Sequence, residues 1–250
     1  MKKTRIPLVL LLSTTPLLVL GGGPYSYSLQ PGTPAWDNAT PAQRVQAATV
    51  PKSWRDTASS AQLFGTAVTN PFFRGIVLSG NQTLADAYNA TKSSGPLAIL
   101  SDAESTSDFG TQALTYLRGL NIITVASATC SQSNGICWMD YIIICHMAET
   151  DNALNKMGGQ SSIQTLFRLA VWDANYFTSQ QDYQIASADV RLMYSIYNKP
   201  ESFRGAFPPG FSLPILTSDH SYALDHEDLP PELVPVLSSA KSALNLTARP

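Results

Sequence analysis

Residues 142–151 read IIICHMAETD, and the interpretation of this stretch decides the fold that the sequence predicts. An apolar run leads without a break into an acidic tip. Isoleucine fits the pleated surface of a sheet, so residues 141–145 are predicted to form a short strand buried on both faces. A buried helix is the alternative, because residues 137–148 are apolar on nearly every face.

The acidic tip carries Glu149 and Asp151. In an open α/β sheet, ligands bind at the carboxyl ends of the strands. Two carboxylates at such an end can bind a divalent cation, since Mn²⁺ and Mg²⁺ prefer oxygen ligands. A solvated loop or a helix N-cap is the other interpretation of this pair. A second polar cluster, residues 218–228, has two histidines and four acids and fits either a metal site or a solvated turn.

Apolar runs around this stretch alternate with segments of helical periodicity. Strands that alternate with helices of about a dozen residues form βαβ units and a parallel sheet. The sequence therefore predicts an α/β fold with a Rossmann-type, mixed but mostly parallel sheet flanked by helices. The predicted strands are 72–78, 97–100, 121–126 and 141–145, and the predicted helices packed on them are 84–92 and 108–119.

Three further segments have local signals. Residues 51–64 are predicted to be a helix with Pro51 in its first turn. After Gly159, a capping-box pattern from Ser161 to Gln164 predicts a helix whose apolar stripe extends to Phe177. Residues 190–196 fit a strand or a helix. Cys130 and Cys137 can form a disulfide in an oxidising compartment, with Cys145 as a buried free thiol, and three reduced cysteines are the alternative.

The N-terminal part predicts entry into the secretory pathway. Residues 1–23 have a basic start and an apolar run, as in a signal peptide or a signal anchor, and residues 24–50 have the composition of a stem or linker. Luminal or secreted location agrees with four Asn-x-Thr sequons. The net charge is −2 without a basic stripe, so no nucleic-acid partner is expected, and membrane contact is expected only through an uncleaved N-terminus. The sequons begin at Asn38, Asn81, Asn89 and Asn245.

Several motifs together resemble the glycogenin and galactinol-synthase-like retaining glycosyltransferases. Residues 68–75 (VTNPFFRG) are similar to the opening strand of that family, and residues 96–102 (PLAILSD) resemble its next strand. Residues 149–151 (ETD) lie within one residue of the Asp-x-Asp position, and residues 218–221 (SDHS) are similar to its Asp-Gln-Ser motif. The departures are Glu for Asp, His for Gln, and a C-terminal His-x-x-Gly-x-x-Lys-Pro-Trp motif that does not appear.

The resemblance implies that residues 51–250 form a GT-A-like domain of the nucleotide-diphospho-sugar transferases. Such a domain transfers a hexose from a UDP-sugar to an acceptor with retention and uses Mn²⁺ or Mg²⁺. The departures leave two alternatives: a non-catalytic binding or scaffold protein, and an unrelated secreted metal-dependent hydrolase that uses Asp102, His146 and Glu149. The implied site residues are Thr69, Asn70, Phe73 and Asp102 for the nucleotide, Glu149 and Asp151 for the metal, and Asp219 and His220 for catalysis.

Overall fold

The protein is helical throughout the part of the chain that the computed structural model describes. This part comprises residues 23–71, 95–106, 108–119, 143–148, 151–198, 207, 211–217 and 229–250. Within these ranges, 66% of the residues are helical and none lies in a strand. The prediction of an α/β fold with a mostly parallel sheet is therefore wrong.

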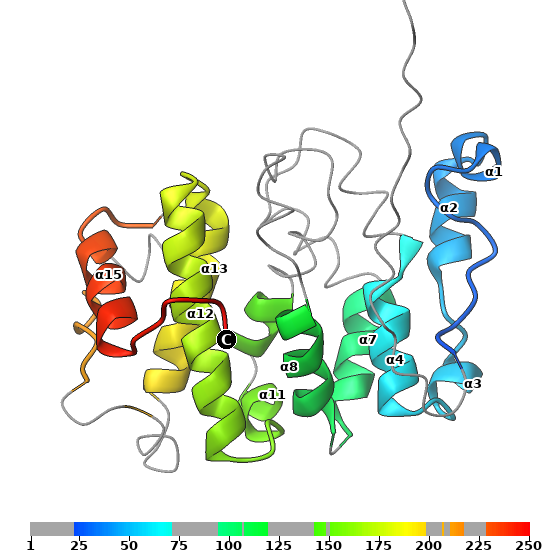
Figure 1. Ribbon diagram of the computed structural model, residues 1–250. Coiled ribbons are helices and arrows are strands. Elements are labelled where there is room, and N and C mark those ends of the chain that lie inside the picture. The colour runs from blue at the N-terminus through cyan, green and yellow to red at the C-terminus, as the bar shows by residue number, and fades with distance from the viewer. Residues whose placement is uncertain are drawn as a thin grey trace, which may run out of the picture.

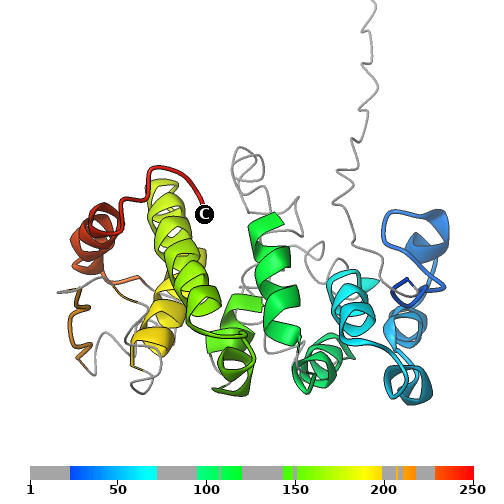
Figure 2. The ribbon, with the colours of Figure 1, turned by 60° about the horizontal axis from the view of Figure 1, so that its bottom comes forward.

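The helices form one row that runs roughly in chain order from α1 at one end to α15 at the other, with α15 packed mainly against α12 (Figures 1 and 2). Their main contacts join near neighbours: α4 with α7 and α8, α8 with α11 and α12, and α12 with α13 and α15. The helices are α1 (Pro34–Asp37), α2 (Pro41–Ala48), α3 (Lys52–Arg55), α4 (Ser60–Val68), α7 (Gly95–Glu104), α8 (Phe109–Gly119), α11 (Asp151–Asn155), α12 (Gln160–Ser179), α13 (Tyr183–Tyr197) and α15 (Leu233–Ala243).

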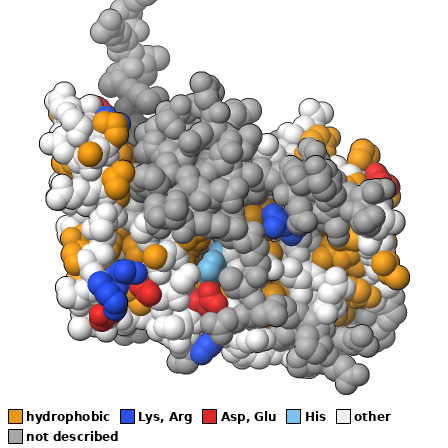
Figure 3. Space-filling model, turned by 180° about the vertical axis from the view of Figure 1, so that it is seen from behind, with side chains coloured by type: hydrophobic (Ala, Val, Ile, Leu, Met, Phe, Trp, Pro, Cys, Tyr) orange, Lys and Arg blue, Asp and Glu red, His pale blue; other side chains and the backbone are white. Residues whose placement is uncertain are grey.

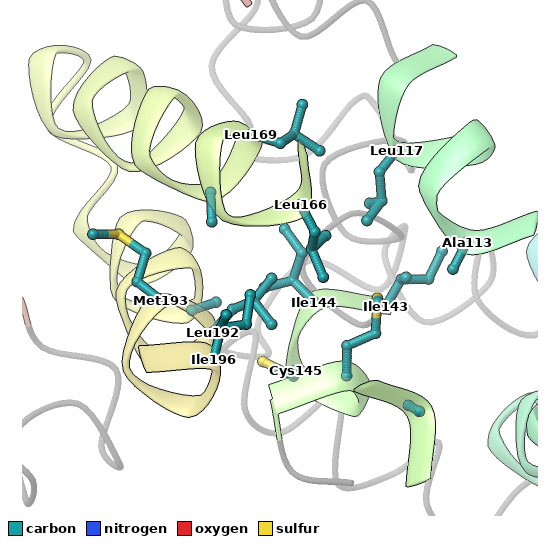
Figure 4. Close-up of a cluster of buried hydrophobic side chains, with 14 of the residues drawn as sticks. Ala113, Leu117, Ile143, Ile144, Cys145, Leu166, Leu169, Leu192, Met193 and Ile196 are labelled. Atoms are coloured by element: carbon teal, nitrogen blue, oxygen red, sulfur yellow. The ribbon is translucent and has the colours of Figure 1, made fainter. Parts of the chain in front are cut away.

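Residues 143–148 form a further helical segment, which we call the central helix, where the sequence predicted the strand 141–145. Five consecutive side chains, from Ile143 to Met147, are buried, so apolar neighbours surround this helix. Figure 4 shows that its side chains lie between α8, α12 and α13. An apolar run this short has no readable period, and the neighbouring helices decide its conformation. The residues labelled around this helix in Figure 4 are Ala113, Leu117, Leu166, Leu169, Leu192, Met193 and Ile196.

The predicted strand 97–100 is also wrong, because these residues lie inside α7. Leu97, Leu100 and Ala103 are buried at a spacing of three, and Ala98 between them is exposed. That spacing places one apolar stripe on a helix, but a window of four residues is too short to distinguish it from a buried strand. The other predicted elements of the sheet, 72–78, 84–92 and 121–126, lie outside the described residues.

The long amphipathic helices are confirmed. Helix α8 covers the predicted segment 108–119, and α12 carries the predicted apolar stripe to Phe177. Helix α12 begins one residue before Ser161, with Gly159 as its N-cap, so the predicted capping box is wrong. Residues 190–196 belong to helix α13, which resolves the ambiguity between strand and helix.

The predicted helix 51–64 is divided into α3 and α4. The Ser59 hydroxyl accepts a hydrogen bond from the Gln62 backbone, and the Gln62 side chain accepts one from the Ser59 backbone. This reciprocal capping box satisfies backbone donors at the start of α4 and so favours a new helix there.

Residues 24–50 were expected to be a linker. They contain α1 and α2 and are hydrogen-bonded to residues in and directly after α4. The Tyr27 side chain is buried, and its hydroxyl donates a hydrogen bond to the Thr66 carbonyl oxygen at 2.8 Å. The Asn70 amide donates to the Tyr27 hydroxyl and to the Ala48 carbonyl oxygen, both at 3.0 Å. These bonds fasten residues 27–48 to α4. No helix among the described residues is both long and apolar enough to cross a membrane.

The close approach of Gly110 to the segment that follows α11 gives the first prediction. A Cβ atom added at Gly110 of α8 would overlap the Lys156 carbonyl oxygen and the Met157 Cα. Because both obstacles are backbone, Gly110→Ala should destabilise the protein by about 1–3 kcal/mol, the usual cost of overpacking. Gly119→Ala in the same helix is the matched control, since a Cβ there meets nothing within 4 Å. Chemical denaturation measures both, and equal stability of the two variants would contradict the close approach.

Candidate functional site

Two of the residues expected to hold the nucleotide, Thr69 and Asn70, make hydrogen bonds within the fold. Thr69 ends α4, and its hydroxyl donates to the Gly65 carbonyl oxygen at 2.7 Å. Asn70 is completely buried, and its amide nitrogen donates the two bonds that fasten Tyr27 and Ala48. Breaking these bonds to bind a ligand would leave buried polar groups unsatisfied, at a cost of about 1–3 kcal/mol each.

Asp102 lies on α7 and forms an ion pair with Arg55 of α3. The Asp102 Oδ2 is 2.6 Å from the Arg55 Nη1, and 44% of the aspartate side chain is exposed. Among the described contacts, none joins Asp102 to Thr69 or Asn70. The structure therefore does not gather these three predicted residues around one ligand.

The remaining predicted residues contribute no described side-chain contact. Asp151 begins α11, but its side chain lies outside the description. No group of three or more metal-ligating side chains comes together among the described residues, and the guanidinium of Arg55 already neutralises Asp102. The prediction of a Mn²⁺ or Mg²⁺ site at Glu149 and Asp151 stays a prediction, because neither of these side chains is described. Phe73, Glu149, Asp219 and His220 lie outside the described residues, as does the predicted pairing of Cys130 with Cys137.

Cys145 is buried and is not in a disulfide, which confirms the prediction of a free thiol.

The candidate functional site is the pair of His146, on the central helix, and Glu104, the last residue of α7. The His146 Nε2 and the Glu104 Oε2 are 2.8 Å apart, and their side chains are 7% and 8% exposed. The Phe109 ring lies edge-on to the imidazole, with centroids 6.3 Å apart. On the face seen in Figure 3, histidine and acidic side chains lie next to each other.

This pair has two chemical uses. A carboxylate that orients an imidazole is the arrangement of many general bases, but a base must reach its substrate. The second use is cohesion, because a buried carboxylate is costly unless it is paired and hydrogen-bonded. Glu104 also stands at the C-terminal end of a helix dipole, which disfavours a negative charge there. His146 offsets both costs and thereby links α7 to the central helix.

A second buried pair joins Asp173 of α12 to Arg249. The guanidinium donates through Nε to Oδ1 at 2.7 Å and through Nη2 to Oδ2 at 2.8 Å. Its Nη1 also donates to the Arg118 carbonyl oxygen, in the last turn of α8, at 3.4 Å. Burial raises the pKa of Asp173, whereas the bonds and the charge of Arg249 act to lower it. The pair therefore connects α8, α12 and the segment after α15.

Sequence analysis missed the partners in both pairs. Neither Glu104 nor Asp173 was among the predicted site residues, and Asp173 interrupts the apolar stripe of α12. That interruption was a usable signal, since an aspartate is almost never fully buried unless it is paired. The partners are 42 and 76 residues apart, so no local pattern identifies them.

The Asp173–Arg249 pair generates the second prediction. Arg249→Met leaves a buried carboxylate without a counter-charge and should destabilise the protein by about 3–5 kcal/mol at pH 7. With its folded-state pKa raised by burial, Asp173 opposes folding only while it is ionised. The loss of stability in the variant should therefore be complete at pH values above the folded-state pKa of Asp173. It should become smaller as the pH falls toward the unfolded-state pKa of about 4.

Denaturant unfolding as a function of pH measures this effect. Adding Asp173→Leu to Arg249→Met should recover most of the stability, because it removes the unpaired charge. Lys52→Met is the matched control: it breaks an ion pair with Asp56 in which the lysine side chain is 76% exposed, and should cost less than about 1 kcal/mol. A pH-independent deficit in Arg249→Met would contradict the prediction.

Comparison with family models, with curated proteins and with solved structures finds no match to this chain. The function proposed below therefore depends on the described side chains and on the arrangement of the helices.

Proposed function

We propose that this chain is a helical binding protein of the secretory pathway, which holds a protein partner along its row of helices and is not itself an enzyme. The observation that carries this proposal is the arrangement of the helices as one row, roughly in chain order, with main contacts between near neighbours. Proteins in which helices stack in this manner present extended surfaces, and they use these surfaces for binding.

The use of the buried polar groups supports the proposal. Asn70, Glu104 and Asp173 are at most 6% exposed, and each bonds a group far away in the sequence. A catalytic site instead needs reactive groups that converge on an accessible cleft. The polar chemistry described in this chain serves to join helices.

The described surface offers three exposed apolar positions at which partner contact can be tested. The exposed large apolar residues Val45, Tyr183 and Ile215 lie on α2, on α13 and in residues 211–217, far apart in the sequence. Figure 3 shows apolar side chains at several separate places on one face. A lipid surface or a strongly charged partner would favour one continuous apolar or charged patch.

The pair of Glu104 and His146 generates the third prediction, which separates cohesion from catalysis. Glu104→Gln and His146→Gln should each destabilise the protein by about 1–3 kcal/mol, because each leaves a buried partner poorly satisfied. The double variant should lose less than the sum, with a coupling of about 0.5–3 kcal/mol. Asp102→Asn is the control for removing a neighbouring carboxylate, since the Asp102 side chain is 44% exposed and that of Glu104 is buried. Full stability in both single variants would contradict a linking role.

The fourth prediction tests binding itself. A photo-crosslinking amino acid placed at Val45, Tyr183 or Ile215 of the full chain, expressed in its own secretory pathway, should form adducts with the same protein from more than one position. The purified partner should then bind the chain reversibly in calorimetry. Crosslinks to unrelated proteins at each position, or no binding by the purified candidate, would contradict the proposal.

A separate measurement on the same protein tests the alternative that the chain transfers sugars. A ligand at 100 times its Kd adds about 2.7 kcal/mol, and each kcal/mol raises the Tm of a chain of this size by about 2–4 °C. We expect no such rise with UDP and Mn²⁺ and no consumption of UDP-sugars. A rise in Tm together with sugar transfer would favour the enzyme over the binding protein.

A further inference from the structure

Two of the four sequons lie in the described part of the chain, and both asparagines are exposed. Asn38 directly follows α1, and Asn245 follows the end of α15. Because α1 and α15 are at opposite ends of the row, the two asparagines are also at opposite ends (Figures 1 and 2). An exposed asparagine outside a helix interior is accessible to a modifying enzyme, whereas a buried one is not.

The backbone around Asn38 is held by bonds that leave its side chain uninvolved. Asn38 is the C-cap of α1, and its N–H bonds to the Pro34 carbonyl oxygen. Thr40, the other sequon residue, is the N-cap of α2, and its hydroxyl accepts a hydrogen bond from the Gln43 backbone at 3.3 Å. The sequon therefore occupies a tight connection between two helices and presents its amide outward.

Asn245 has a different local structure. Its φ of 51° is in the left-handed region, where asparagine is better tolerated than most residues. The Leu246 N–H bonds to the Lys241 carbonyl oxygen at 3.1 Å, and the Leu246 side chain is buried. The left-handed backbone at the end of the helix therefore accounts for an asparagine at position 245. It does not account for the exposed Thr247 two residues later, which completes the sequon.

We propose that Asn38 and Asn245 carry N-linked glycans. The donor is an oligosaccharide on a polyprenyl diphosphate, as used in the lumen of the secretory pathway. The side-chain amide nitrogen forms a bond to the anomeric carbon of the oligosaccharide, the bond from that carbon to the diphosphate oxygen breaks, and the amide loses one proton. No oxidant or reductant is required.

The glycans would keep a partner away from α1 and α15 at the two ends of the row. A glycan is bulky and hydrated, so one at each end shields α1 and α15 and leaves α8, α12 and the helices beside them open. This consequence rests on the proposed binding function, whereas the attachment of the glycans does not.

The test expresses the full chain, with its own N-terminus, in a eukaryotic secretory host. Asn38→Gln and Asn245→Gly should each remove one step of glycosidase-sensitive mass, and the double variant should remove two. Glycine preserves the left-handed backbone at position 245, so the second variant loses the acceptor without strain. Thr40→Ser and Thr247→Ser keep both the sequon and the local hydroxyl, and should keep the mass of the wild type.

Peptide mapping after amidase treatment should find aspartate in place of asparagine at both positions. A chain that reaches the medium with unmodified Asn38 and Asn245 would overturn the glycan proposal while leaving the binding function intact. A chain that stays in the cytosol would overturn both the glycans and the secretory location.

Discussion

The burial of the central helix is the interaction on which the rest of the structure depends. Ile143, Ile144 and Met147 are at most 1% exposed and contribute to one continuous apolar core. Full burial of such a side chain stabilises a fold by about 1.5–3 kcal/mol. Because the central helix lies between α8 on one side and α12 and α13 on the other, it gives the two halves of the row a shared core (Figure 4).

Apolar burial has no preferred direction, so it does not by itself decide which helices meet. The two buried polar pairs specify which helices pack against each other. Glu104 with His146 fixes the end of α7 against the central helix, and Asp173 with Arg249 fixes α12 against the end of α8. A different packing would leave these groups buried and unpaired, which costs far more than the pairs gain in the correct one.

The same polar pairs bear on function. Their side chains are placed where solvent and ligands have little access, so both pairs serve to maintain the arrangement of the helices. The row of helices presents a long surface, and apolar, charged and histidine side chains all lie on the face drawn in Figure 3. Such a surface suits recognition of another protein better than it suits chemistry on a small substrate.

The sequence alone determined the helices α8 and α12, because apolar residues at helical spacing over 11 and 20 residues identify a helix without reference to neighbours. It also identified Cys145 as a buried thiol. Only the tertiary structure decided that residues 97–100 and 143–145 are helical, since short apolar runs fit a buried strand equally well. It alone paired Glu104 with His146 across 42 residues, because a distant partner leaves no trace in local periodicity.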